Sequence, residues 1–283
     1  MAFRTNFASI IGLSSKRDFA TCCEQSSTET HFVDLKLNFT DYRPITLLYT
    51  DYNILAGLFA DRLKHVLSDI IGPEQYCAVR NTSIIQGVAV LRDVQFIVKS
   101  TPGPAYLLNI DLDKAFDREN WNLLDRILLH VGFPRTTIAI LQTLRRDATT
   151  QINLNGRLGE SFAIQSSVRQ GCPLTMSQFV LYIEPLLRTL HSKLYYGISV
   201  GTRTLTCIRY VDDVTYIVRS EDDVDRINET LSAFTRAAIA QVISAKTKLL
   251  DLKPEPHSLR QVSPYVTTDP LRTLGIEFMQ NSG

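Results

Sequence analysis

The chain shows two kinds of hydrophobic periodicity, one helical and one alternating. Between positions 51 and 71 apolar residues recur three or four apart, and the pattern stops at Gly72-Pro73, which predicts an amphipathic helix. Alternation over 150–164 around the two-residue turn signal at 155–156 predicts a β-hairpin. Helical spacing predicts further helices over 84–98, 121–131, 138–144, 179–190 and 224–234. We interpret these apolar faces as packing surfaces of a core.

Two strand-like runs enclose a pair of adjacent acids. The runs 205–211 and 214–218 are rich in β-branched and aromatic residues, so they predict a hairpin with Asp212 and Asp213 at its tip. Another apolar run, which also reads as a strand, ends in Asp111. Buried charges need partners, and the apolar runs on either side of the acid pair offer none.

These acids predict a metal site. Neighbouring strand residues point to opposite faces, so only one of Asp212 and Asp213 can aim fully at a given point. A third carboxylate is therefore needed, and Asp111 is the best candidate. Carboxylate oxygens suit Mg²⁺, and a pair of such ions activates one oxygen and stabilises the leaving one. The alternative reading of an Asp-Asp pair taken alone is a solvated turn.

Composition describes a globular protein. The chain has 283 residues, of which 45% are hydrophobic and 21% charged, so it can form one large domain or two closely joined ones. The formal net charge of +1 is low for a nucleic-acid-binding protein, and basic residues would have to line one groove. The five cysteines form no CxxC pair and no zinc spacing. With no membrane span and no signal pattern, we expect an intracellular protein, nuclear or cytoplasmic, that is not secreted.

Three motifs in a fixed order carry a resemblance. YVDD at 210–213, DLDKAFD at 111–117 and RQGCPL at 169–174 resemble the reverse transcriptase of LINE-type (non-LTR) retrotransposons, and the likeness runs from about residue 42 to 275. The resemblance implies an α/β right-hand polymerase fold, with an antiparallel palm sheet backed by helices, mainly helical fingers and a largely missing thumb. It divides the chain into an unassigned lead-in at 1–36, fingers at 37–104, palm at 105–252 and the start of the thumb and primer grip at 253–283.

The resemblance also implies roles for individual residues. Asp111, Asp212 and Asp213 would hold two Mg²⁺ ions, for which Mn²⁺ can substitute, and Lys246 would help protonate the leaving pyrophosphate. Phe116 would reject a ribose 2′-hydroxyl by bulk. Template or substrate contacts would come from Arg43, Arg169, Gln170, Gly171 and Tyr210. From the residues alone, Arg43 also reads as a surface arginine, Phe116 as core and Lys246 as a solvated lysine.

The sequence departs from the family pattern in places. Asn81-Thr82 stands where the family has Gly-Arg, which removes a charge-assisted contact unless Arg80 reaches the same place. Ile243 replaces an Asn, and Thr175 replaces a Ser while keeping the hydroxyl. Without an endonuclease segment, we expect no autonomous insertion.

We therefore expect an RNA-directed DNA polymerase acting on an RNA template, a DNA primer and dNTPs. The main alternative is an inactive retroelement remnant that at most binds nucleic acid, and a weaker one is another two-metal nucleotidyl transferase. Group II intron and telomerase-like enzymes share the palm chemistry, but the motifs are closer to the LINE group. No membrane partner is expected, and the sequence does not indicate an oligomeric state.

Overall fold

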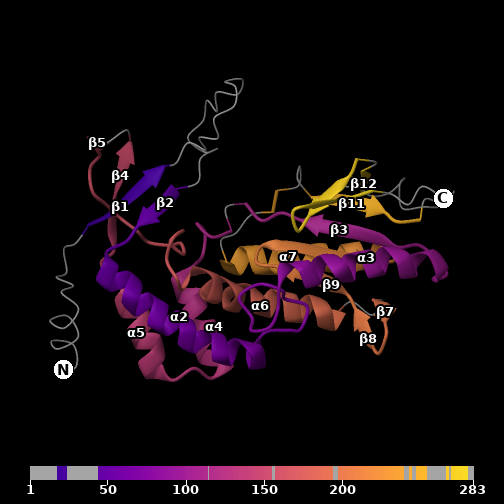
Figure 1. Ribbon diagram of the computed structural model, residues 1–283, viewed down its shortest axis with the longest axis horizontal. Coiled ribbons are helices and arrows are strands. Elements are labelled where there is room, and N and C mark those ends of the chain that lie inside the picture. The colour runs from indigo at the N-terminus through magenta and orange to yellow at the C-terminus, as the bar shows by residue number, and fades with distance from the viewer. Residues whose placement is uncertain are drawn as a thin grey trace.

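The computed structural model describes residues 18–23, 44–113, 115–154, 157–193, 197–238, 242–243, 247–253, 266–267 and 269–279. Helices and strands are mixed within these ranges, and two five-stranded sheets carry most of the strand pairing. Figure 1 shows the sheet that contains β1, β2, β4 and β5 toward one end of the molecule and the sheet that contains β3, β11 and β12 toward the other. The sequence-based α/β assignment is confirmed.

The first sheet combines segments that lie far apart in the chain. Its order is β2-β1-β4-β5, with β6 also paired to β4. β1 runs parallel to β4 and antiparallel to β2, so it lies between them. Its residues belong to the lead-in to which the sequence assigned no element, since no local periodicity marks it. The strands are β1 (Asp18–Cys23), β2 (Pro44–Leu47), β4 (Thr149–Leu154), β5 (Arg157–Leu158) and β6 (Phe162–Ala163).

The second sheet holds the acidic motifs. Its order is β12-β11-β3-β10-β9, and every pairing is antiparallel except that of β11 with β12. The central strand is β3, the run that the sequence predicted would end in Asp111. The strands are β3 (Tyr106–Ile110), β9 (Cys207–Tyr210), β10 (Asp213–Val218), β11 (Lys248–Asp251) and β12 (Val266–Thr267). The antiparallel palm sheet is confirmed.

The predicted helices form close to their expected bounds. They are α2 (Thr50–Ile70), α3 (Ile84–Ser100), α4 (Trp121–Val131), α5 (Arg135–Arg145), α6 (Thr175–Lys193) and α7 (Glu221–Ala238). The backbone N–H of Ser83 donates to Oε1 of Gln86 at 2.9 Å, which helps to satisfy the start of α3. None of the helices in the described ranges has both the length and the apolar character that a membrane crossing requires.

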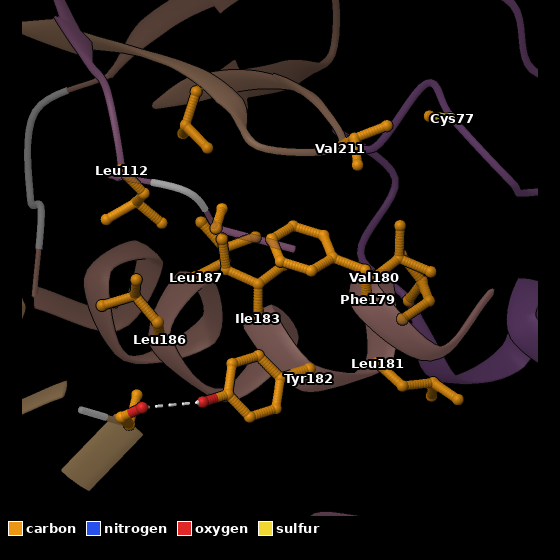
Figure 2. Packing of buried hydrophobic residues seen from close by; sticks show 14 of the residues in the cluster. Cys77, Leu112, Phe179, Val180, Leu181, Tyr182, Ile183, Leu186, Leu187 and Val211 are labelled. Carbon is orange, nitrogen blue, oxygen red and sulfur yellow. Dashed lines mark hydrogen bonds between the residues drawn. The ribbon is translucent and has the colours of Figure 1, made fainter. Parts of the chain in front are cut away.

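Alternation of side chains along β3 divides the interior into two cores, one on each face of the second sheet, which we call the central sheet. Tyr106, Leu108 and Ile110 of β3 pack into the core that includes α6 and α7, while Leu107 between them packs into a core with α3. Figure 2 shows α6 at close range, with the side chains of Phe179, Ile183 and Leu187 directed into the first core. The central sheet is thus covered on both faces, which holds the ends of its strands in place.

Two short hairpins complete the described fold. They are formed by β7 (Ile198–Val200) with β8 (Arg203–Leu205), and by β13 (Leu271–Thr273) with β14 (Ile276–Phe278). The predicted hairpin over 150–164 is confirmed by the pairing of β4 with β5, although its turn residues 155–156 lie outside the described ranges.

Candidate active site

The acid pair lies on the hairpin of β9 and β10, but the two acids do not share its tip. Asp213 is the first residue of β10 and pairs with Tyr210, so the tip consists of Val211 and Asp212 alone. Val211 has a φ of 61°, which is a strained conformation for a β-branched residue. The prediction that both acids occupy the tip is wrong for Asp213, because strand pairing extends through it.

A buried glutamine holds this strained turn. The backbone N–H groups of Val211 and Cys77 each donate to Oε1 of Gln75 at 3.1 Å, and Gln75 is only 1% exposed. Its neighbours extend the sheet, since the N–H of Tyr76 donates to the carbonyl of Arg209 at 2.9 Å. Sequence reasoning quoted Gln75 only as part of a family segment and gave it no role, because its partner lies 136 residues away.

A buried ion cluster lies behind the hairpin. Arg209 is 2% exposed, and its guanidinium donates to Glu184 at 3.2 Å and to Glu74 at 2.9 Å. Two carboxylates around one guanidinium satisfy a charge that burial would otherwise penalise strongly. The cluster joins β9 to α6 and to the segment that carries Gln75. It therefore fixes the strand that leads to Asp212.

Asp111 and the acid pair lie at the same end of the central sheet. Val214 of β10 pairs with Ile110 of β3, so the next step of the register sets Asp213 beside Asp111. The carbonyl of Asp111 accepts the N–H of Ile243 at 3.0 Å, which connects the strand end to the described part of the family-like segment after α7. All three acids are partly exposed. The topology therefore brings together the motifs that the sequence paired.

The carboxylate of Asp213 is occupied by hydrogen bonds. Its Oδ1 accepts from Nδ2 of Asn109 at 2.7 Å and from Oγ1 of Thr273 at 2.9 Å, and its Oδ2 accepts the N–H of Leu274 at 2.8 Å. Among the residues that the structure describes, no three His, Cys, Asp or Glu side chains come together as a metal site. The three predicted ligands therefore stay a prediction, and the carboxylate of Asp213 is the one that protein donors engage.

The fit to a divalent cation is therefore uneven among the three acids. Asp111 and Asp212 are partly exposed carboxylates at a strand end and a turn, where hard oxygen ligands suit Mg²⁺. Asp213 uses three of its roughly four lone-pair positions on protein donors. Asp111 and Asp212 are the residues that fit, and the metal ligands stay a prediction.

The partly exposed Tyr210 lies beside the buried Cys77 near the tip. The Cys77 thiol beside Tyr210 raises the pKa of its phenol, with partial burial adding to the effect. Burial raises the pKa of the Cys77 thiol, and a hydrogen bond from Tyr210 works in the opposite direction. The side chain of Tyr210 therefore lies over the segment that supports the turn, and its predicted contact with substrate stays a prediction.

The glycine of the RQG motif permits close contact between backbones. Gly171 has a φ of 106°, and a Cβ at this position would lie 2.8 Å from the carbonyl oxygen of Thr46. The carbonyl of the preceding Gln170 accepts the N–H of Thr46 at 2.8 Å. The close approach expected of this glycine is confirmed, and the neighbouring backbone is that of β2. Contact between Gly171 and substrate is untested.

The side chain of Arg169 in the RQG motif is buried. It is 7% exposed, its guanidinium lies 5.3 Å from the ring centre of Tyr52, and it donates to the carbonyl of Leu144 at 3.4 Å. Cation–π stacking on a buried ring accounts for this position. Arg169 thus joins α2 and α5 to the RQG turn, and its predicted contact with substrate stays a prediction.

The other predicted contacts have mixed outcomes. Phe116 is half-buried, with its ring centre 4.5 Å from that of Phe179, so it packs against the core and keeps an exposed part. Nε2 of Gln170 donates to Asp117 at 3.4 Å. Arg43 and Lys246 lie outside the described residues.

Two residues that sequence reasoning missed are Asn109 and Thr273. Both donate to Asp213, and Asn109 stands as a lone amide within an apolar strand. That isolated polar residue was the available signal, because an amide on a largely buried strand needs hydrogen-bond partners.

Comparison with known proteins gives consistent matches. The family described as "Reverse transcriptase (RNA-dependent DNA polymerase)" matches residues 34–278. The "Transposon TX1 uncharacterized 149 kDa protein" of Xenopus laevis is 31% identical over 216 residues, covering 76% of this chain and 16% of that protein. The Pol polyprotein of the type-1 retrotransposable element R2 from Popillia japonica is 24% identical over 218 residues, covering 76% and 29%. The chain thus spans a minor part of these relatives.

Solved structures match the fold at low sequence identity. Apo telomerase from Candida tropicalis, truncated from its C-terminal domain, aligns with a TM-score of 0.58 and 15% identity over 82% of this chain and 44% of that one. Telomerase from Candida albicans, in complex with a fragment of telomeric RNA, aligns with a TM-score of 0.56 and 13% identity over 81% and 37%. These likenesses show the right-hand polymerase fold.

Proposed function

Because the chain belongs to the reverse transcriptase family and its relatives are proteins of non-LTR retrotransposons, we propose that it forms the fingers and palm of an RNA-directed DNA polymerase. The observation that carries the proposal is the position of Asp212 at a strained turn beside the strand end at Asp111. Two carboxylates at the end of a rigid, doubly covered sheet suit phosphoryl transfer, in which positioning and electrostatics do most of the work.

We assign the cation-holding role to Asp111 and Asp212. A bound Mg²⁺ would supply activation of a primer 3′-hydroxyl and stabilisation of the leaving pyrophosphate. Gln75 and the Arg209 cluster hold the turn and the strand that carry Asp212. Phe116 would reject a ribose 2′-hydroxyl with the exposed part of its ring, which favours dNTPs.

We propose that the RNA template contacts a basic hollow beside α2. A cavity of about 450 Å³ is lined by Lys64, His65 and Arg80, together with Asp61, Ala78 and Val79. Arg80 is exposed at the position where the sequence raised the possibility that it replaces the missing family arginine. Cationic side chains at a concave surface attract phosphate groups. This placement supports an RNA-binding role for the segment around Arg80.

Primer extension tests the proposal. The chain of residues 1–283 is given an RNA template, an annealed DNA primer, dNTPs and Mg²⁺, and DNA product is measured. We expect synthesis in Mg²⁺, and we expect Asp212→Ala to reduce it by at least about 10³-fold, because loss of a metal-holding carboxylate removes transition-state stabilisation.

Asp222→Asn is the matched control, since it removes an exposed acid at the start of α7, away from the site. Its activity should equal that of the wild type. RNA binding without any Mg²⁺-dependent product would support the inactive remnant instead, and incorporation without a template would indicate a different nucleotidyl transferase.

A further inference from the structure

The carboxylate of Asp213 connects two hairpins that are distant in the sequence. One hairpin is that of β9 and β10, which carries Asp212, and the other is that of β13 and β14. Oγ1 of Thr273 and the N–H of Leu274, both at the end of β13, donate to Asp213 at 2.9 and 2.8 Å. They lie 60 and 61 residues away along the chain. The same carboxylate also accepts from Asn109 of β3.

The donors around Asp213 form a closed network. Nδ2 of Asn109 donates both to Asp213 at 2.7 Å and to Oγ1 of Thr215 at 3.1 Å. The hydroxyls of Thr215 and Thr273 lie 2.8 Å apart, and both residues are 1% exposed. Because the two threonine hydroxyls are buried, loss of the Asp213 acceptor would leave buried donors without a partner. The network therefore fixes the relative position of β3, β10 and β13.

The turn that Asp213 anchors has an unusual backbone. Leu274 has a φ of 52° and Gly275 a φ of 75°, so both lie in the left-handed region. Left-handed residues other than glycine persist only where their surroundings hold them. The hydrogen bond from the Leu274 N–H to a carboxylate is charge-assisted and provides such support.

Lone-pair counting shows how fully the protein uses the Asp213 carboxylate. A carboxylate has about four acceptor positions, and Asp213 uses both on Oδ1 and one on Oδ2 for protein donors. A cation at Asp213 would compete with these short hydrogen bonds. Asp212 stands at the turn, one residue before the ladder of β10 begins. The two acids of the pair therefore have different surroundings although they are adjacent.

We propose that Asp213 is a positioning residue that fixes the β13–β14 hairpin to the hairpin that carries Asp212, and that its carboxylate does not hold the cation. The inference rests on the proposed function for its second half only. The anchoring half concerns hydrogen bonds that exist whether or not the chain makes DNA.

A double-mutant cycle tests the anchor. Asp213→Asn keeps the size of the side chain but turns one acceptor into a donor that faces an N–H, and Thr273→Val removes the hydroxyl. Each single variant should lower the melting temperature by about 4 °C or more, and the double variant should lose clearly less than the sum. Thr273→Ser, which keeps the hydroxyl, should stay near the wild type. Additive losses would overturn the anchor.

Mn²⁺ binding, followed by electron paramagnetic resonance of the free chain, tests the division of roles without relying on activity. Asp111→Asn and Asp212→Asn should each weaken Mn²⁺ binding by at least about tenfold, while Asp213→Asn and Thr273→Val should change it by less than about twofold. In primer extension, Asp213→Asn and Thr273→Val should both reduce the rate, and both should leave the half-saturating Mg²⁺ concentration unchanged. A Mn²⁺ affinity that falls with Asp213→Asn as much as with Asp212→Asn would overturn the inference. If the wild type neither binds Mn²⁺ nor makes DNA, the proposed function and the cation assignment both fail, and the thermal cycle still decides the anchor.

Discussion

At residue 171 the chain turns with a φ of 106° and passes within van der Waals contact of β2. A side chain at this point would meet the carbonyl of Thr46, so both conformation and space require glycine. Gly57 offers a natural comparison, because it lies within α2 and a Cβ there would meet nothing within 4 Å. The same substitution at the two positions therefore separates local constraint from general glycine effects.

We predict opposite effects for these two glycines. Gly171→Ala should lower the free energy of unfolding by about 2 kcal/mol or more, from backbone strain and the close contact with Thr46. Gly57→Ala should raise it by about 0.5–1 kcal/mol through better helix propensity. Urea denaturation of both variants provides the measurement. A stable Gly171→Ala protein would show that β2 can move away from the turn.

At the scale of elements, the start of α4 buries an acid without a hydrogen-bond partner. Glu119 precedes the N-cap Asn120, is fully buried, and neither carboxylate oxygen has a partner among the described residues. Burial raises its pKa from the ordinary value of 4.5 to about 8, with Arg145 opposing and Asp125 reinforcing the shift. The side chain is therefore protonated in the folded protein at neutral pH, as an apolar environment demands.

This acid should make stability depend on pH. The folded state binds the proton of Glu119 more tightly than the unfolded state, so its contribution is complete below about pH 4.5 and is lost as the pH rises through about 8. Glu119→Gln should remove this dependence. Thermal melts of the wild type and of Glu119→Gln check this. At pH 5 the two proteins should have similar stabilities, and at pH 8.5 the variant should be more stable than the wild type by a few kcal/mol, on the order of magnitude of the pKa shift. Equal melting temperatures of the wild type and the variant at both pH values would contradict the predicted protonation of Glu119.

At the scale of the whole molecule, a net charge of +1 offers little general attraction for RNA. Any strong electrostatic contact must come from a local group of cations, and the hollow lined by Lys64 and Arg80 is such a group. RNA binding there would release counterions, so the affinity for RNA would fall as the salt concentration rises.

A charge-reversal pair tests this location. Lys64→Glu with Arg80→Glu should weaken RNA binding by about tenfold or more at low salt and reduce the slope of affinity against salt concentration. Lys99→Glu with Arg236→Glu changes the net charge equally at exposed positions outside the hollow, and should change the affinity by less than about threefold. Fluorescence anisotropy at several salt concentrations measures both pairs. Equal losses in the two would mean that RNA responds only to net charge.

Local periodicity by itself determined the helices, the strand that leads to Asp111, the hairpins over 150–164 and 205–218, and the α/β class. Each of these depends on neighbours a few residues apart. Motif order also indicated that Asp111 and the acid pair would meet, which the register of β3 with β10 bears out. The strand β1 escaped prediction, because its pairing partners rather than its own pattern define it.

Only the tertiary structure decided what each polar side chain does. Gln75 reaches a turn 136 residues away, Asp213 reaches one 61 residues away, and Arg169 turns inward onto Tyr52. A motif specifies which residue types are present, whereas their hydrogen-bond partners depend on which distant segments the fold brings alongside. Two adjacent aspartates thus acquire different surroundings, because Asp213 pairs within the strand β10 whereas Asp212 lies in the turn.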